Sequence, residues 1–255
     1  MVTSPLYKLL EARLLPKLRS YLTNGLARSQ TGFVSKMDTS VNLCRAVERI
    51  KLRTNAKKHA FCLFLDFRSA YNTIPHIKLF NKLYGILDAE EIQLLWALYS
   101  RLSINLGDEE LKANVGVAQG SMISPALFNI YAEDLILNLA EHGFNILDIF
   151  AFADDHMVIC ESIAQLKEAI ALINNWCSNS NIKLNVLKSG IVEMVSSHCR
   201  KLQLEIGSTI CEVPVLSVYK YLGLYMDQKL KGEIHMSSIK GKLDFLSSSI
   251  SFHDS

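Results

Sequence analysis

Apolar residues recur at helical spacing along several stretches of the chain. The first stretch is a row of leucines at positions 6, 10, 14, 18 and 22. Pro16 lies between two of them and predicts a kink or two short helices. Two further helices have recognisable caps, one at Asp38 or Thr39 and one at a capping box of Asp88 and Glu91. The remaining helices are predicted over residues 125–142, with Ser124 at the cap, 163–176 and 231–252.

Short apolar runs between these helices predict strands. Residues 60–65 are six consecutive apolar residues, typical of a strand that is buried on both faces. The runs 146–151 and 157–160 flank the sequence Phe152-Ala153-Asp154-Asp155, which predicts the tip of a β-hairpin. Further strands are predicted within residues 103–117, 182–186 and 190–195. Helices and strands alternate irregularly, so the predicted fold class is α+β.

Carboxylates occur where two of these strands end. Asp154 and Asp155 occupy the predicted hairpin tip, and Asp66 follows the buried strand 60–65. Taken singly, each position is also compatible with a solvated turn or a helix N-cap. If the strands are neighbours, the three carboxylates repel one another unless cations neutralise them. Two Mg²⁺ ions, about 3.5–4 Å apart, would do so and would support in-line phosphoryl transfer.

Several segments together resemble the motifs of reverse transcriptases, in the family's order. The central palm motifs are matched by Asp66 to His76, Gly116 to Pro125 and Phe152 to Asp155. The fingers, lysine and primer-grip motifs are matched by Gln30 to Phe33, Leu184 to Ser189 and Tyr219 to Gly223. The resemblance covers residues 5 to 250 and is closest in character to non-LTR retrotransposon and group II intron proteins.

The resemblance implies a fingers-and-palm polymerase hand, with an antiparallel palm sheet packed on helices and a thumb that is largely absent. Residues 1–60 would form a basic portion of the fingers. Residues 61–225 would form the palm, with a fingers insertion at about 77–115. Residues 226–255 would be the start of a thumb or a C-terminal helix.

The resemblance also implies the reaction and the metal ligands. Asp66 and Asp154 would bridge two Mg²⁺ ions, for which Mn²⁺ can substitute, and Asp155 would be a weaker third ligand. The main-chain carbonyl of Phe67 would complete the shell. A primer 3′-hydroxyl would attack the α-phosphate of an incoming deoxynucleoside triphosphate, with catalysis by positioning and charge neutralisation.

The same motifs suggest nucleotide contacts. Tyr71 matches the position of an aromatic ring that excludes the ribose 2′-hydroxyl, although a core tyrosine is the plain alternative. Gln119 and Gly120 match a loop that contacts nucleotide and template. Lys188 would neutralise or protonate the leaving pyrophosphate. Lys36 is the only cation just after the fingers motif.

Charge is distributed unevenly along the 255 residues, although the net charge is only +2. Residues 1–60 carry twelve Lys/Arg and three Asp/Glu, whereas residues 61–160 carry five and thirteen. The basic first quarter of the chain is compatible with a surface that binds template and primer phosphates. It is equally compatible with charges that only keep one helix and its loop solvated. The predicted nucleic-acid contacts are Lys51, Arg53, Lys57 and Lys58, together with the primer-grip residues Tyr221, Leu222 and Gly223.

Two functions remain open at this stage. One is an RNA-directed DNA polymerase core that uses an RNA template, a DNA or RNA primer and deoxynucleotides. The other is an inactive relative that serves as a scaffold or RNA-binding subunit, with other proteins, in a larger ribonucleoprotein. Val34 and Met37 stand where the family commonly carries arginines, which favours the scaffold, whereas the three carboxylates favour the polymerase.

The sequence also argues against a membrane partner, a structural zinc site and secretion. No stretch of the sequence approaches the length and apolarity of a transmembrane span, so no membrane partner is expected. The cysteines lack CxxC spacing, so no structural zinc site is predicted. Residues 1–20 have the pattern of a helix rather than a signal peptide, which argues against secretion and fits nucleus, cytoplasm or an organelle such as the mitochondrion equally.

Overall fold

The computed structural model describes residues 5–24, 29–34, 36–100, 103–106, 109–112, 114–118, 120–194, 205 and 207–240. Its named α-helices are α1 (Pro5–Asn24), α2 (Thr39–Asn55), α3 (His76–Leu83), α4 (Ala89–Tyr99), α5 (Ser124–Glu141) and α6 (Ile163–Ser180). Residues 233–240 are also helical, and short 3₁₀ turns cover Ala70–Asn72 and Ile146–Asp148.

The strands are short and mostly antiparallel pairs. The first six are β1 (Ala60–Leu65), β2 (Phe67–Arg68), β3 (Ser103–Leu106), β4 (Glu109–Lys112), β5 (Ile149–Phe152) and β6 (Asp155–Cys160). The last six are β7 (Lys183–Leu184), β8 (Gly190–Met194), β9 (Thr209–Ile210), β10 (Val213–Pro214), β11 (Val218–Tyr221) and β12 (Leu224–Asp227).

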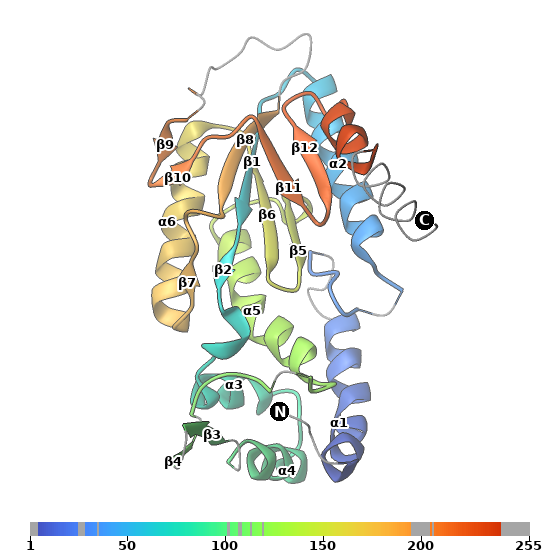
Figure 1. Ribbon diagram of the computed structural model, residues 1–255, viewed down its shortest axis with the longest axis vertical. Coiled ribbons are helices and arrows are strands. Elements are labelled where there is room, and N and C mark those ends of the chain that lie inside the picture. The colour runs from blue at the N-terminus through green and yellow to red at the C-terminus, as the bar shows by residue number, and fades with distance from the viewer. Residues whose placement is uncertain are drawn as a thin grey trace, which may run out of the picture.

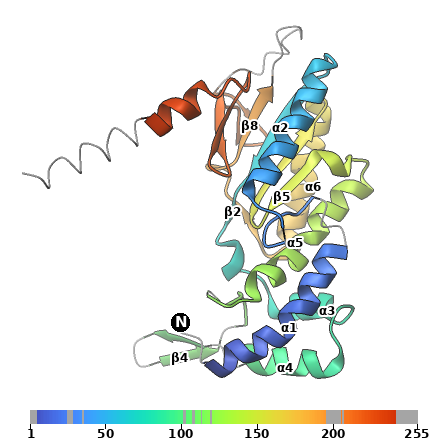
Figure 2. The same ribbon diagram turned by 90° about the vertical axis from the view of Figure 1, so that its right-hand side faces the viewer.

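A four-stranded antiparallel sheet, in the order β5-β6-β1-β8, forms the centre of the molecule. Helices α5 and α6 cover one face, and helix α2 with the hairpin β11–β12 covers the other (Figures 1 and 2). Strand β1 is buried along its whole length, as its continuous apolar run predicts. Its side chains alternate between two cores, because Phe61 and Leu63 pack on the α5–α6 side and Cys62 and Phe64 on the α2 side.

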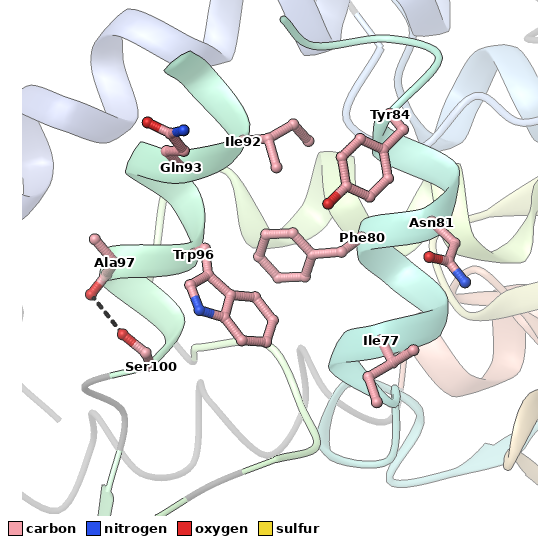
Figure 3. Close-up of a pocket in the computed structure, with 9 residues that line it drawn as sticks. All are labelled: Ile77, Phe80, Asn81, Tyr84, Ile92, Gln93, Trp96, Ala97 and Ser100. Carbon is pink, nitrogen blue, oxygen red and sulfur yellow. Dashed lines mark hydrogen bonds between the residues drawn. The ribbon is translucent and has the colours of Figure 1, made fainter. Parts of the chain in front are cut away.

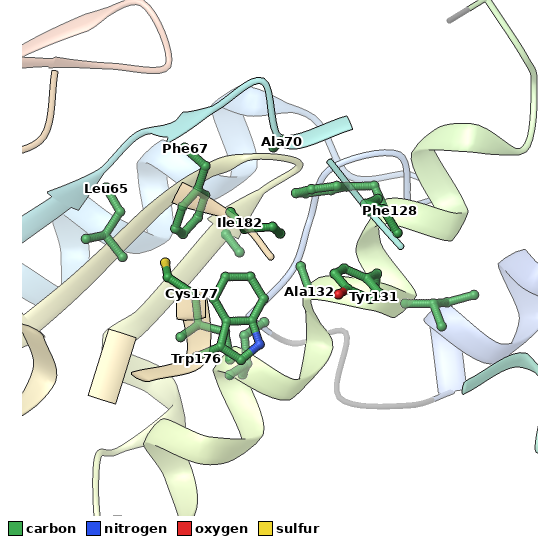
Figure 4. Packing of buried hydrophobic residues seen from close by; sticks show 14 of the residues in the cluster. Leu65, Phe67, Ala70, Phe128, Tyr131, Ala132, Trp176, Cys177 and Ile182 are labelled. Atoms are coloured by element: carbon green, nitrogen blue, oxygen red, sulfur yellow. The ribbon is translucent and has the colours of Figure 1, made fainter. Parts of the chain in front are cut away.

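The larger core extends past the end of β1 into the turn that follows it. Phe67 is buried, and its ring centroid lies 5.6 Å from that of Trp176 of α6. Figure 4 shows Phe67, Trp176, Cys177 and Ile182 gathered in this part of the core. Burying an aromatic ring of this size contributes roughly 1.5–3 kcal/mol. The backbone on the C-terminal side of Asp66 is therefore anchored by packing.

Helices α1, α3 and α4, with the hairpin β3–β4, form the other end of the molecule (Figure 1). Helix α1 runs through Pro16 as one element, so of the two predicted alternatives, a kink or two short helices, the second is wrong. Proline removes one backbone hydrogen bond, and the buried leucines on both sides of it, Leu14, Leu18 and Leu22, hold the helix together. No helix among the described residues is long and apolar enough to cross a membrane.

The predicted caps are confirmed at two helices and wrong at a third. Asp38 accepts a hydrogen bond from the main-chain N–H of Val41 (2.9 Å), and Asp88 and Glu91 form the capping box. Ser124 instead lies inside α5, where its hydroxyl donates to the carbonyl of Ala118 (2.7 Å). A serine beside a loop thus formed a tertiary hydrogen bond in preference to a local cap.

Three other boundaries differ from the prediction. Residues 146–148 form a 3₁₀ turn rather than strand, because Asn145 caps them by accepting a hydrogen bond from Leu147 N–H (2.9 Å). Helix α6 continues four residues past Trp176 and ends at Ser180. Asn181 caps it in the left-handed conformation, which asparagine tolerates. The predicted strand 182–186 is only the two-residue β7.

Candidate active site

The three predicted carboxylates, Asp66, Asp154 and Asp155, lie at one end of the central sheet, and this end is called the carboxylate edge. Leu65 pairs with His156 at the end of β1, and Asp66 and Asp155 are the next residues of the two strands at that same end of the sheet. Asp154 lies in the turn between β5 and β6. Residues 66 and 154 are more than eighty positions apart in sequence, and the fold alone brings them together.

The carboxylates influence one another electrostatically. Partial burial, together with the charge of Asp66, raises the pKa of Asp154 above its ordinary value. Loss of hydration and the charges of Asp154 and Asp66 raise the pKa of Asp155 to about 6, although the residue is exposed. Like charges are thus held close together, and a bound cation would relieve this repulsion.

The donor atoms of this edge suit a hard divalent cation. Carboxylate oxygens and a main-chain carbonyl, such as that of Phe67, are the ligands that Mg²⁺ and Mn²⁺ accept. Within the described ranges, no group of three or more His, Cys, Asp or Glu side chains is already arranged to hold a metal ion. The donor chemistry therefore fits a metal, and the carboxylate side chains would have to turn toward it.

Asp66 is held by the loop that follows β7. The side-chain amide of Asn185 donates to Oδ2 of Asp66 (2.8 Å), and Asn185 N–H donates to the Asp66 carbonyl (2.8 Å). The main-chain N–H of Asp66 donates to Ser189 Oγ (3.1 Å). Lys188 is exposed on this same loop, and its carbonyl accepts a hydrogen bond from the Tyr219 hydroxyl (2.8 Å). Asn185 and Ser189 both belong to the predicted lysine motif, which gave no indication that they hold Asp66.

Tyr71 lies beside the carboxylates on a rigid support. Its ring stacks on Phe128 of α5, with centroids 4.6 Å apart and an interplanar angle of 19°. Burial and the nearby Asp154 raise the pKa of Tyr71 well above its usual range. Its carbonyl accepts a hydrogen bond from Val117 N–H (2.8 Å), which ties it to the Gly116 loop.

The Gly116 loop continues to the other predicted nucleotide contacts. Gly116 has φ +90° and lies against the backbone of Asn72, where a Cβ would be 3.1–3.3 Å from three backbone atoms. Gly120 also has a positive φ, +83°, and is exposed. Gln119 lies outside the described residues.

The predicted nucleic-acid contacts divide into exposed and buried residues. Lys51, Lys57 and Lys58 are exposed at the end of α2 and in the loop after it, and Lys36 is exposed before α2. These four side chains remain candidates for phosphate contacts. Arg53 does not, because it is buried and binds Asp148 and Glu161 within the protein.

Tyr221 is also buried, contrary to the prediction that it contacts nucleic acid. It is 2% exposed in the α2-side core, and its hydroxyl donates to Oδ1 of Asn42 (3.1 Å). Leu222 and Gly223 form the turn between β11 and β12, both with positive φ. Successive side chains of a strand point to opposite faces, so Tyr221 points into the core, whereas the turn that follows it lies at the surface.

His156 is a residue that the motif pattern gave no reason to single out. It is 2% exposed, and its ring contacts the Phe67 ring edge-on, with centroids 5.4 Å apart. Burial lowers the pKa of His156 to about 4, so the imidazole is neutral at pH 7. It is a core residue directly beneath the carboxylates.

An apolar groove lies between α3 and α4 (Figure 3). These two helices are at one end of the molecule (Figure 1). Figure 3 shows the rings of Phe80, Tyr84 and Trp96 turned toward one another across it. None of the residues that line the groove carries a charge. The groove therefore has no groups for phosphoryl chemistry and is separate from the carboxylate edge.

The chain matches the family model described as "Reverse transcriptase (RNA-dependent DNA polymerase)" over residues 1–226. The chain belongs to the reverse transcriptase family. This confirms the family that the ordered motifs predicted. The match includes every motif segment from Gln30 to Gly223.

Curated relatives come from retroelements. The "RNA-directed DNA polymerase from mobile element jockey" of Drosophila funebris is 26% identical over 253 residues, which cover 91% of this chain and 27% of that protein. The "Probable RNA-directed DNA polymerase from transposon X-element" of Drosophila melanogaster is 28% identical over 226 residues, covering 84% and 24%. This reverse transcriptase chain thus spans about a quarter of the length of these relatives.

Solved structures with a similar fold include telomerases. The apo telomerase from Candida tropicalis truncated from its C-terminal domain has a TM-score of 0.62 at 15% identity, covering 87% of this chain and 44% of that chain. The telomerase from the same organism in complex with the TWJ fragment of telomeric RNA has a TM-score of 0.61 at 13% identity, covering 90% and 38%. At this identity the likeness shows the fold alone. Together with the antiparallel sheet and its helices, it confirms the predicted α+β fingers-palm class.

Proposed function

We propose that this chain is the fingers-palm core of an RNA-directed DNA polymerase that extends a primer 3′-hydroxyl with deoxynucleotides. The observation that carries the proposal is the meeting of Asp66, Asp154 and Asp155 at one sheet edge. Packing does not account for carboxylates gathered in one place, because burial and their mutual repulsion raise the pKa of Asp155 and oppose folding. A site for cations and phosphates accounts for them.

Each residue around the edge has a part in this proposal. Two divalent cations, when bound, would neutralise the charge that develops in in-line phosphoryl transfer. Asp66, Asp154 and the Phe67 carbonyl would hold them, with Asp155 as a weaker ligand. Asn185 donates a hydrogen bond to Oδ2 of Asp66 and thereby helps to hold that side chain at this end of the sheet. Lys188, exposed on the same loop, would meet the leaving pyrophosphate.

Tyr71 would select the sugar. Its stacking on Phe128 prevents the ring from moving aside, so a ribose 2′-hydroxyl would meet a fixed wall. Gln119 and Gly120 would contact the nucleotide and template, and Lys36 the triphosphate. Leu222 and Gly223 of the β11–β12 turn would support the primer end.

The proposed partners are an RNA template, a DNA or RNA primer and deoxynucleoside triphosphates. The names of the retroelement relatives, which are RNA-directed DNA polymerases, support this choice, as does the telomerase neighbour solved with an RNA fragment. Lys51, Lys57 and Lys58 offer exposed positive charge for phosphates.

Primer extension on an RNA template with Mg²⁺ tests the proposal. We expect DNA product from the wild type and a loss of at least 100-fold for Asp154→Asn, because the neutral amide is a poor ligand for a hard cation. Asp134→Asn makes the same chemical change on the outer side of α5, where Asp134 pairs with Lys82, and should leave extension unchanged. Absence of any Asp154-dependent product, with partner proteins of the element supplied, would refute the polymerase.

A scaffold or RNA-binding subunit of a ribonucleoprotein is the second candidate. It is favoured by the lack of a ready-made metal cluster within the described part of the chain and by Val34 and Met37 at positions where the family commonly has arginines. This function predicts that wild type and Asp154→Asn bind RNA equally and that neither makes product. Product from the wild type alone would rule it out as the main function.

A further inference from the structure

A short segment before α2 runs alongside strand β5 and extends the sheet by one position. Gln30 forms a parallel bridge with Ala151. Ala151 N–H donates to the Ser29 carbonyl (2.7 Å), and Thr31 N–H donates to the Ala151 carbonyl (2.9 Å). The segment therefore covers the outer edge of β5, the strand that leads into the carboxylate turn.

The side chain of Gln30 reaches past this bridge and binds the turn itself. Its Oε1 accepts a hydrogen bond from Ala153 N–H (2.9 Å), and its Nε2 donates to the Ala153 carbonyl (3.2 Å). The same Oε1 accepts a hydrogen bond from Gly32 N–H (2.9 Å). Gln30 is 5% exposed, so these bonds are shielded from water. One side-chain amide thus satisfies both main-chain groups of Ala153.

Ala153 needs this support because of its conformation. Its φ is +56°, in the left-handed region that an alanine adopts only under constraint. The Ala153 carbonyl belongs to the peptide group that joins it to Asp154. The orientation of that peptide therefore sets the direction in which Asp154 leaves the turn.

Other buried groups fix the segment that carries Gln30. The amide of Asn42 donates to Thr31 Oγ1 (2.8 Å) and to the Ala151 carbonyl (3.1 Å). The amide of Asn129 donates to the Gly32 carbonyl (2.6 Å). Gly32 has no room for a side chain, since a Cβ there would lie 2.3 Å from Ala153 N. The segment and the turn are thus fitted to each other at backbone distance.

We infer that Gln30 is a positioning residue for Asp154: it clamps the Ala153 peptide and thereby aims the carboxylate. The inference rests on the proposed function for its catalytic consequence. It gives the Gln30–Gly32 segment a role that its resemblance to a fingers motif did not supply. Gln30 acts through the backbone of Ala153, so its removal should weaken metal binding and turnover while nucleotide contacts stay in place.

The test compares Gln30→Met with Gln165→Met in the full chain. Methionine keeps the length of glutamine and removes both hydrogen-bonding atoms. Gln165 is the matched control, because its Oε1 also accepts one main-chain hydrogen bond, from Glu161 N–H (2.6 Å), at the other end of β6. Three readouts are needed: exchange of the Ala153 amide hydrogen, binding of Mn²⁺ alone by electron paramagnetic resonance, and steady-state primer extension.

For Gln30→Met we expect faster exchange of the Ala153 amide. Mn²⁺ affinity and kcat should each fall roughly 10–100-fold, the usual range when an outer-shell group of a metal site is lost. The KM for the deoxynucleotide should stay within about twofold, which a general loss of stability would not achieve. Gln165→Met should match the wild type in all three readouts. Unchanged Mn²⁺ affinity and kcat in folded Gln30→Met would overturn the inference.

Two further measurements keep the inference open to refutation if Gln30→Met does not fold. In the wild type the Ala153 amide, although in a turn, should exchange as slowly as the amides of β6; rapid exchange overturns the clamp. Gly32→Ala should push the turn away and lower Mn²⁺ affinity in the same way. If the wild type shows no Asp154-dependent Mn²⁺ binding, the proposed function fails, whereas the Ala153 exchange rates still decide whether Gln30 holds the turn.

Discussion

Replacing Asp148 should destabilise the protein more than any other change in its ion cluster. The carboxylate is 2% exposed and receives paired hydrogen bonds from two arginines of α2. Arg49 contacts it at 2.6 and 3.1 Å, and Arg53 binds both its oxygens while also contacting Glu161 at 2.6 Å. The cluster joins α2 to the turn before β5, and so it fixes the helix that carries Asn42 beside the carboxylate turn.

The expected costs follow from what each change leaves unpaired. Asp148→Ala leaves the buried guanidinium of Arg53 with only the exposed Glu161, a broken buried pair that costs about 3–5 kcal/mol. Arg53→Ala leaves Asp148 still bound by Arg49, so the loss should be roughly 1.5–3 kcal/mol, the value of hydrogen bonds to a charged group. Arg49 is partly exposed, and its removal should cost about 1 kcal/mol or less.

Urea unfolding of the three variants measures these differences, with Lys51→Ala, an exposed change on the same helix, as the control. Although burial alone would raise it, the pKa of Asp148 is held below its ordinary value by Arg49 and Arg53. Its contribution is therefore full above the unfolded pKa of about 3.9 and is lost as the pH falls through the lower folded pKa. Asp148→Asn should lack this acid-dependent part. A cost below about 1 kcal/mol for Asp148→Ala would refute the reasoning.

Two other predictions concern the proposed function. Tyr71→Val should let the proposed polymerase incorporate ribonucleotides, because removing the ring that rests on Phe128 opens space for the 2′-hydroxyl. The ratio of kcat/KM for deoxy- and ribonucleotides measures this effect, and unchanged discrimination would count against the steric role. Lys51→Ala and Lys58→Ala should each weaken RNA binding and reduce the steepness of log affinity against log salt concentration by roughly 1. Arg53→Met should leave that salt dependence unchanged, because Arg53 binds Asp148 within the protein.

The apolar pattern and the local capping signals were sufficient to predict many of the elements. The uninterrupted run of β1, the hairpin around Asp154 and the capping box of α4 are all present where expected. These features are local, since each depends on the spacing or chemistry of a few adjacent residues. The predicted closeness of Asp66 and Asp154 needed one further assumption, that their strands are neighbours, and the pairing of β1 with β6 confirms that assumption.

The predictions were wrong where contacts with residues distant in sequence determined whether a side chain is buried. Arg53 lies in a basic stretch, and only its partners Asp148 and Glu161, about a hundred residues later, show that it faces inward. Tyr221 belongs to a motif that suggested a nucleic-acid contact, yet its hydroxyl bonds Asn42 in the core. In both cases the residue type was compatible with either environment, because long amphipathic side chains are stable inside once their polar ends are paired.

The carboxylate edge is held from two sides by side-chain amides that bind main-chain groups. Asn185 binds the Asp66 carboxylate and backbone on one side, and Gln30 binds the Ala153 backbone on the other. Amides suit this task because they carry a donor and an acceptor without adding charge next to mutually repelling carboxylates. A lysine or arginine in either place would neutralise the carboxylates and compete with a cation. The neutral supports around these carboxylates therefore favour the proposed metal site over a purely structural turn.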